Sequence, residues 1–298
     1  MINLLSKIFK NKDNNYYFED FNNYKKNSSI EKIFDLISSI PENSEIRYVG
    51  GFVRKIINKE KVDDIDLATN VNPRKICEIL KKNNISFYES GIEHGTITAK
   101  IENYKFEITT LRKDISTDGR HAKVEFSNDW HEDASRRDFT FNSIYSDLDG
   151  NLYDPFNGKA DLGLGKVKFI GDPEKRIRED YLRILRYVRF YLNYSKIDHE
   201  NDLKKIIKQN INGVSKISSE RLIDELKKLV LSPGFLKISK DKFCQEIISL
   251  IFPQLINLKI FKDIDNHLKK IFEKKDFIFL ICLMIIDETD NSEYFIYK

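Results

Sequence analysis

The feature that most constrains this chain is a change of character near residue 150, where strand signals give way to long helical patterns. Before that point, short runs rich in β-branched and aromatic residues alternate with helix-sized segments. Beyond it, apolar residues recur at helical spacing. The order predicts an α+β head followed by an all-helical body. The helical patterns cover about 173–193, 198–210, 218–231, 240–250 and 257–273.

Turn residues and periodicity place the elements of the head. Strands are expected at 45–49, 65–68, 96–101 and 105–111. Helices are expected at 30–37, 52–58 and 73–82, and the last of these begins with a proline. Residues 1–27 are polar and rich in Asn and Lys, so they are expected to form a loosely ordered lead-in.

Composition limits the class of protein. Hydrophobic residues make up 41% of the 298 residues, which is enough for a core, and the net charge is only +3. Any nucleic-acid-binding surface would therefore be a local patch. The three cysteines are far apart with no CxxC pair, which indicates reduced thiols in a cytoplasmic protein. The longest apolar run, 277–286, is too short for a bilayer and predicts a buried helix, so no membrane association is expected.

Two carboxylates suggest a metal site in the head. Asp64 and Asp66 lie two residues apart in the strand-like segment DDIDLAT. Because side chains in a strand alternate between faces, both carboxylates point the same way. They repel each other unless a cation lies between them, and Mg²⁺ prefers such oxygen ligands. Exposed strands often carry two solvated acids at this spacing, so the pair gains meaning only from its surroundings.

The surroundings add a glycine pair and a third acid. Gly50-Gly51 lies between an expected strand and an expected helix. There it could let a triphosphate approach backbone N–H groups, although an ordinary turn has the same sequence. A phosphate cradle followed by a metal pair on the next strand is more specific than either alone. Glu107 is the candidate third carboxylate, because a neighbouring strand can bring it beside the pair; a salt bridge at the rim is the equal alternative.

Two further observations concern phosphate and metal chemistry. The run Arg136-Arg137-Asp138 suits a nucleotide, because guanidinium groups bind phosphate and a carboxylate binds ribose hydroxyls. The five histidines are scattered along the sequence, and no HD motif or metal-ligand histidine cluster is evident. A metal-dependent phosphohydrolase is therefore disfavoured.

Eight segments between about residues 40 and 235 carry a family resemblance. They are GGFVRK at 50–55, DDIDLAT at 63–69, EHGTITA at 93–99, FEITTLR at 106–112, RRDFTFNS at 136–143, DPFNGKADL at 154–162, REDYLRILRYVRF at 178–190 and SERLIDELKKL at 219–229. In order and spacing they resemble the class II tRNA nucleotidyltransferase and poly(A) polymerase family. After the polar lead-in at 1–27, the resemblance implies a polymerase-β-like head with a mixed sheet and helices at 28–155, a helical neck at 156–235 and a helical body at 236–298.

The resemblance also implies roles for the matching residues. Asp64 and Asp66 resemble the metal-binding pair, beside which Glu107 is the candidate third catalytic acid from the strand argument. Asp154 and Gly158 lie in the hinge motif, and residues 113–123 resemble the mobile loop needed to add A after C. Glu220 and Arg221 resemble the motif that steadies the neck. The residues expected to bind the nucleotide are Gly50, Gly51, Arg54, Arg112, Arg136, Arg137, Asp138, Asn142, Asp180, Arg183 and Arg186.

Two departures from the family pattern stand out. Lys55 occupies a position where the family usually has Asp, so local hydrogen bonding is expected to change there while the metal pair is intact. The C-terminal part also looks short, since family members commonly continue with a tail that grips the tRNA elbow.

The implied activity is addition of C, C and A to the tRNA 3′ end from CTP and ATP, with Mg²⁺ and without a nucleic acid template. The partners are tRNA lacking part or all of its CCA end and the two nucleotides; protein partners are not indicated. Asp180 and Arg183 are expected three residues apart on one helix face, where they could read the base. The carboxylate would accept from the amine of C or A, and the guanidinium would donate to the ring edge. A surface salt bridge has the same spacing.

Several alternatives are open from the sequence. A bacterial poly(A) polymerase shares the head motifs, and a partial enzyme could add only CC or only A. A non-catalytic RNA-binding module would not need the carboxylate pair. The segment EHGTITA and the loop at 113–123 favour complete CCA addition.

Overall fold

The computed structural model describes residues 17, 19–26, 28–41, 43–62, 64–116, 123–262 and 276–286. These residues form two compact units. The first contains the described residues up to Leu164 together with Lys168–Gly171, and the second contains Gly165–Val167 and the chain from Asp172 onward. The predicted α+β head and all-helical remainder are confirmed as a fold class. The predicted domain limits stay a prediction, and the first unit continues past residue 155.

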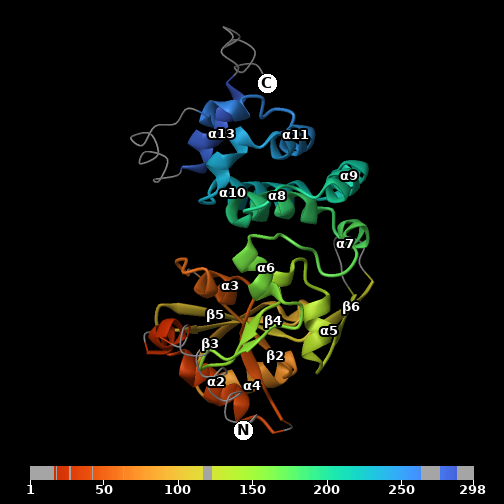
Figure 1. Ribbon diagram of the computed structural model, residues 1–298. Coiled ribbons are helices and arrows are strands. Elements are labelled where there is room, and N and C mark those ends of the chain that lie inside the picture. Colours follow the sequence, from red (N-terminus) through yellow and green to blue (C-terminus); the bar gives the residue numbers. More distant parts are fainter. Residues whose placement is uncertain are drawn as a thin grey trace, which may run out of the picture. The chain divides into compact units, whose positions relative to one another are not determined.

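A mixed sheet forms the centre of the first unit (Figure 1). Its seven strands have the order β3-β4-β5-β2-β1-β8-β9. β2 and β5 pair in parallel, while β1 pairs antiparallel with both β2 and β8. A separate hairpin consists of β6, Arg112–Ser116, and β7, Lys123–Phe126. The sheet strands are β1 Ile46–Val49, β2 Ile65–Thr69, β3 Ser86–Gly91, β4 Thr96–Ile101, β5 Tyr104–Thr110, β8 Tyr145–Ser146 and β9 Leu152–Tyr153.

Aromatic side chains fill one face of this sheet. Tyr48 points from β1 into a cluster in which it stacks on Phe52 with ring centroids 4.5 Å apart and contacts Phe34 at 5.0 Å. Because neighbouring strand residues alternate, Val49 points to the opposite face, where Tyr145 and Trp130 pack. The helices of this unit are α2 Ile30–Ser38, α3 Gly51–Ile57, α4 Pro73–Lys82, α5 Trp130–Ser135 and α6 Gly158–Leu164.

Part of the expected lead-in belongs to the core of the first unit. Residues 19–26 are helical, and Phe21 is fully buried with its ring 5.5 Å from that of Tyr48. The polar composition of 1–27 hides this contribution, because a single apolar face of one short helix is enough to cover the aromatic cluster. Residues 1–16 lie outside the described residues.

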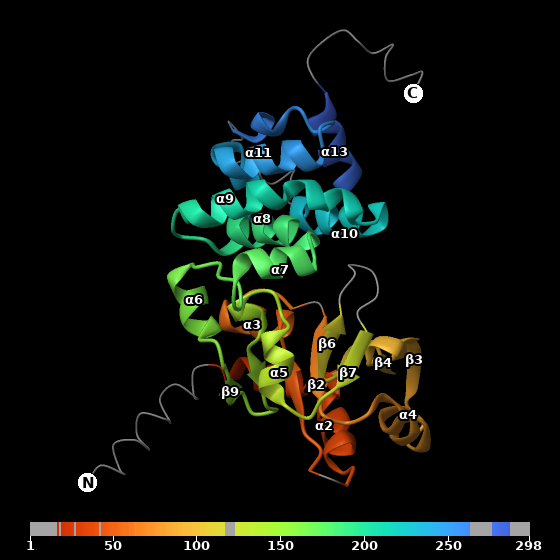
Figure 2. The same ribbon diagram turned by 90° about the vertical axis from the view of Figure 1, so that its right-hand side faces the viewer.

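The second unit is helical, as expected (Figure 2). One predicted helix, 173–193, is interrupted, because α7 ends at Glu179 and α8 begins at Leu182. The predicted helix at 257–273 begins with a short 3₁₀ turn, Leu258–Phe261, and residues 263–275 lie outside the described part. The helices are α7 Pro173–Glu179, α8 Leu182–Tyr194, α9 Asn201–Asn210, α10 Ser219–Val230, α11 Lys242–Ile251 and α13 Phe277–Ile285.

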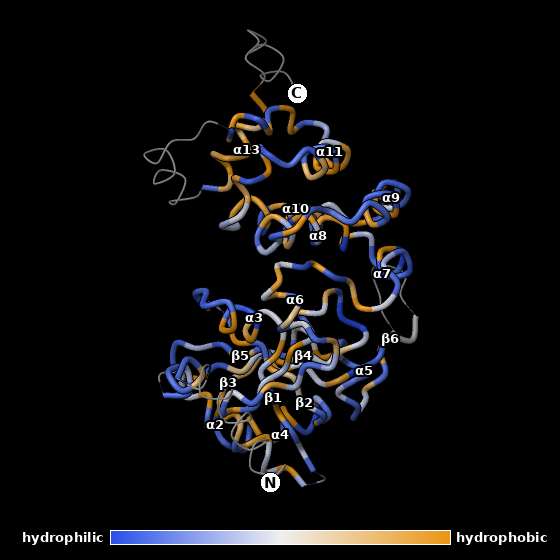
Figure 3. The backbone as a smooth tube through the Cα atoms, viewed as in Figure 1, coloured by the Kyte–Doolittle hydropathy of each residue, from blue (hydrophilic) through white to orange (hydrophobic). Residues whose placement is uncertain are grey.

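The apolar run at 277–286 forms helix α13, but only one side of it is buried. Hydrophobic residues follow one another along α13 (Figure 3), yet Leu280 and Met284 are buried while Ile278 is 69% exposed. None of the described helices combines the length and apolar character that a membrane crossing requires.

Candidate active site

Strand pairing gathers the acidic residues of the head. Asp66 on β2 and Glu107 on β5 are register partners in the parallel pair, so their side chains leave the same face of the sheet. Asp64 stands just before the first residue of β2 and is exposed. The structure therefore places the proposed third carboxylate on the strand next to the predicted pair.

The charges of these groups oppose one another. Burial raises the pKa of Asp66 to about 6, and the charges of Glu107 and Asp64 add to the effect, while Arg137 and Arg54 oppose it. A carboxylate with a raised pKa is one whose ionised form lacks compensation. A divalent cation supplies that compensation, and carboxylate oxygens are its preferred ligands. The chemistry of the donor set therefore fits a hard divalent metal.

The glycine turn lies directly beside this cluster. Gly50 has φ +62°, a conformation that L side chains rarely adopt, and it precedes the first residue of α3. A Cβ on Gly51 would lie 3.5 Å from Oδ2 of Asp66, and one on Gly50 would lie 3.4 Å from Nη1 of Arg137. A Cβ at position 51 would occupy the space next to the carboxylate, which glycine leaves open to a ligand such as a phosphate.

A hydrogen-bonded chain extends from the turn to the arginine motif. The buried guanidinium of Arg54 donates to Oδ1 of Asn142, whose amide donates to Oδ1 of Asp138 at 2.8 Å. Asp138 also accepts from the backbone N–H of Phe139 at 2.8 Å. Three residues predicted to bind the nucleotide are thus held in one network, because a buried guanidinium needs such partners.

Sequence reasoning missed the anchor of the arginine pair, Asp133. Its carboxylate accepts from Arg136 at 2.7 Å, from Arg137 at 3.0 Å and from the Tyr145 hydroxyl at 2.6 Å. Burial alone would raise the pKa of Asp133, but the charges of Arg137 and Arg136 outweigh it and hold the pKa well below its usual range. The signal was an acid three and four positions before the arginines, the spacing of helix neighbours.

Asp154 and Gly158 shape the end of the first unit. Oδ1 and Oδ2 of Asp154 accept from the backbone N–H groups of Gly158 and Lys159 at 2.7 and 2.8 Å, which caps α6. A Cβ on Gly158 would lie 2.2 Å from the carbonyl oxygen of Thr140, so only glycine fits. Both residues hold α6 against the Thr140–Asn142 turn, the segment that carries Asn142.

The two residues expected to read the base are arranged differently from the prediction. Asp180 and Arg183 do not share the face of one helix, because Asp180 adopts an extended conformation, φ −154° and ψ 104°, between α7 and α8. Its Oδ1 accepts from the N–H of Leu182 at 3.2 Å, and aspartate favours such a capping position over a helix interior. The expected continuous helix is wrong at this point.

Ion pairs fix these side chains individually. Arg221 donates to Oδ2 of Asp180 at 2.8 Å, and Arg183 donates to Glu179 at 2.9 Å. The buried Glu225 lies 2.5 Å from Arg189 and 3.8 Å from Arg186. Arg221 therefore contacts the very carboxylate expected to read the base.

The remaining predicted residues lie near the β6–β7 hairpin. Arg112 begins β6, and its guanidinium donates to the carbonyl oxygen of His94. Of the predicted loop at 113–123, residues 117–122 lie outside the described residues, and the flanking segments are strands.

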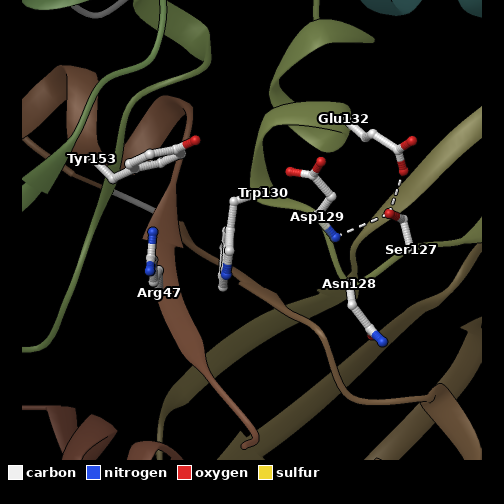
Figure 4. Close-up of a pocket in the computed structure, with 7 residues that line it drawn as sticks. All are labelled: Arg47, Ser127, Asn128, Asp129, Trp130, Glu132 and Tyr153. Carbon is white, nitrogen blue, oxygen red and sulfur yellow. Dashed lines mark hydrogen bonds between the residues drawn. The ribbon is translucent and has the colours of Figure 1, made fainter.

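A cavity of about 570 Å³ lies elsewhere in the first unit (Figure 4). The guanidinium of Arg47 stands 4.2 Å from the ring centre of Trp130 and 5.1 Å from that of Tyr153. None of the predicted site residues lines this cavity. The carboxylate cluster is therefore the candidate active site because of its chemistry, although this cavity lies apart from it.

Comparisons with known proteins show which families and folds the chain resembles. Residues 46–168 match the poly(A) polymerase head domain family. The chain is 47% identical over 192 residues to the mitochondrial CCA tRNA nucleotidyltransferase 1 of Mus musculus, covering 63% of this chain and 44% of that protein. It thus spans about half the length of the curated relatives it matches.

Two solved structures resemble the fold. The Bacillus stearothermophilus CCA-adding enzyme in complex with CTP has a TM-score of 0.62 at 25% identity, over 78% of this chain and 59% of that one. A tRNA nucleotidyltransferase complexed with a primer tRNA and an incoming ATP analogue has a TM-score of 0.65 at 25% identity, over 85% of this chain and 75% of that one.

Proposed function

Because the chain belongs to the class II tRNA nucleotidyltransferase and poly(A) polymerase family, we propose that it adds C, C and A to the 3′ end of tRNA from CTP and ATP without a nucleic acid template. The observation that carries the proposal is the pairing of Asp66 with Glu107 beside the Gly50-Gly51 turn. The complexes of similar proteins with CTP, and with tRNA and an ATP analogue, support the choice of substrates.

In the proposed reaction the tRNA 3′-hydroxyl oxygen bonds to the α-phosphorus of the nucleotide, and the bond to pyrophosphate breaks. Members of this family use a divalent metal, and we propose that it is Mg²⁺ held by Asp64 and Asp66. When bound, the ions supply positive charge to the attacking oxygen and to the leaving pyrophosphate. Glu107 adds negative charge beside Asp66 and strengthens that metal site.

The residues around the carboxylates would position the nucleotide. Gly50 and Gly51 leave space for the triphosphate. Arg54 adds positive charge, and Asn142 holds Asp138 so that its carboxylate can accept from a ribose hydroxyl. The proton of the attacking hydroxyl passes to solvent or to a carboxylate oxygen of the cluster. We assign Arg112, Arg136 and Arg137 to the phosphates, with Asp133 fixing the last two.

Base choice belongs to Asp180 and Arg183 in this proposal. Asp180 is fixed by Arg221 and would accept from the exocyclic amine of C or A. Arg183 would donate to the acceptor on the ring edge, and Arg186 would assist from the next turn of α8. U and G present a carbonyl and a ring N–H at those positions, which would leave both contacts unmade at a cost of about 1–3 kcal/mol each.

We also propose that the protein works in the cytosol and binds RNA. Cys77, Cys244 and Cys282 are free thiols, which suits a reducing compartment.

The test of the proposed site is nucleotide transfer to tRNA as a function of Mg²⁺. Wild type should require the metal, and Asp64→Asn and Asp66→Asn should each lose transfer while keeping the fold, because each removes a ligand charge. Lys55→Ala, at a half-buried position outside the carboxylate cluster, is the control and should retain transfer. More than a few per cent of the wild-type rate in both Asp variants would refute the assignment of this pair.

A further inference from the structure

Three potential metal ligands meet in the second unit, two from one turn of chain and the third more than 40 residues before them. His199 lies in the connection between α8 and α9, Asp241 caps α11, and Cys244 stands in the first turn of that helix. Nε2 of His199 is 3.1 Å from Oδ2 of Asp241 and 3.8 Å from Sγ of Cys244. One ligand atom from each residue lies within 4.8 Å of the other two.

These separations match the edges of a zinc tetrahedron. Zinc binds imidazole nitrogen and carboxylate oxygen at about 2.0–2.2 Å and thiolate sulfur at about 2.3 Å. Tetrahedral angles then separate nitrogen from oxygen by roughly 3.3 Å and nitrogen from sulfur by roughly 3.6 Å. The distances of 3.1 and 3.8 Å differ from these by only a few tenths of an ångström, which is within reach of small side-chain rotations.

The surroundings of His199 already orient its ring as a ligand. Nδ1 lies 2.8 Å from the hydroxyl oxygen of Tyr187, and Nε2 faces Asp241 and Cys244. In the tautomer with its proton on Nδ1, the lone pair of Nε2 is available to a metal ion. The ring stacks on Tyr191 at 3.5 Å and meets the edge of Phe243 at 4.7 Å. A partner on the second ring nitrogen is what metal-binding histidines usually have.

The carboxylate is positioned as well. Oδ1 of Asp241 accepts from the N–H of Cys244 at 2.8 Å, which leaves Oδ2 for a second partner. The side chain of His199 is 8% exposed and that of Asp241 is 20% exposed, while Cys244 is fully buried. The cluster thus has one edge open to solvent, through which an ion can enter and a water can complete its coordination.

We propose that His199, Asp241 and Cys244 form a zinc site that ties the α8–α9 connection to the start of α11. Imidazole and thiolate select zinc over magnesium, so this site differs in chemistry from the carboxylates of the head. Binding joins three segments, which stabilises the second unit, and it releases the thiol proton to solvent.

Cobalt is the probe that tests the proposal, because a bound thiolate gives Co²⁺ a charge-transfer band in the near ultraviolet. The full chain is stripped with a chelator, kept reduced with a phosphine and titrated with Co²⁺. Wild type should bind one thiolate-linked cobalt, which Zn²⁺ displaces. Cys77→Ser and Cys282→Ser are matched controls that keep the band, as does Asp66→Asn, whereas Cys244→Ser loses it. Tyr187→Phe should weaken cobalt binding about 10- to 100-fold.

X-ray absorption spectroscopy at the zinc edge, on the wild-type protein loaded with Zn²⁺, gives a second measurement that needs no variant. One sulfur at about 2.3 Å beside nitrogen and oxygen ligands is expected. A wild-type protein without the cobalt band, a band that persists in Cys244→Ser, or a zinc spectrum without sulfur would overturn the proposal. The three residues would then form a hydrogen-bonded network only.

Discussion

Asp66→Asn should make the metal-free protein more stable while it abolishes transfer. The ionised carboxylate of Asp66 is electrostatically unfavourable in the folded protein, because burial and then the charge of Glu107 raise its pKa from the ordinary 3.8 to about 6. Asparagine has the shape of the protonated acid and carries no charge. The substitution therefore removes the electrostatic cost of the site together with its metal affinity.

The magnitude follows from linkage. Between pH 3.8 and 6 the native state binds more protons than the unfolded state, so the stability of the wild type falls as pH rises through that interval. Each unit of pKa difference corresponds to about 1.36 kcal/mol. Asp66→Asn should thus gain up to about 3 kcal/mol at pH 7, about half of that at pH 5 and little below pH 4.

The fluorescence of Trp130 is the natural assay, because it is the one tryptophan of the chain and packs against Tyr145 in the first unit. Urea unfolding without metal should give a higher midpoint for Asp66→Asn at neutral pH. Added Mg²⁺ should stabilise the wild type but not the variant. Asp64→Asn is the control: its side chain is exposed, so its free energy of unfolding should change by less than about 0.5 kcal/mol. If Asp66→Asn is less stable than wild type at pH 7, or its gain is the same at pH 4, the reasoning is wrong.

Three further predictions concern residues that the structure connects. Asp133→Asn should lower the free energy of unfolding by about 3–5 kcal/mol at neutral pH, because two arginines lose a buried partner. Since the pKa of Asp133 is lowered in the folded state, the difference should shrink as pH falls below about 4. A loss under 1 kcal/mol in unfolding followed by Trp130 fluorescence would contradict the anchor role. Asp180→Ala should raise the efficiency of UTP relative to CTP, and Arg183→Ala should reduce discrimination against both U and G; unchanged ratios on one tRNA would place base choice elsewhere. Arg221→Ala should slow C and A addition together by releasing Asp180, with partial recovery in Arg221→Lys, whereas equal activity in all three proteins would show that the ion pair is dispensable.

The parts of the fold that follow from local patterns were predictable. Alternation and turn residues located β1, β2, β4 and β5 to within a residue or two, and Pro73 marked the start of α4. The proximity of Asp66 to Glu107 could also be expected, because both residues lie in segments with clear strand composition. Short elements with weak patterns, such as β8 and β9, gave no such signal.

Features that depend on tertiary contacts were not predictable. The helix break at Asp180 was hidden because apolar periodicity continues on both sides of one extended residue. Phe21 looked like part of a polar segment, although it completes an aromatic core. The histidines looked scattered in the sequence, yet the fold places His199 beside Asp241 and Cys244, which follow it by more than 40 residues.

The sequence of the product tests the central claim most directly. A tRNA that ends at the discriminator base is incubated with Mg²⁺ and labelled CTP, ATP, UTP or GTP, singly and together, and the extended 3′ ends are sized and sequenced. The proposed function predicts two additions with CTP alone, three additions ending in A with CTP and ATP, and none with UTP or GTP. A long run of A with ATP alone would show a poly(A) polymerase, addition of only CC or only A would show a partial enzyme, and no extension would contradict catalysis altogether.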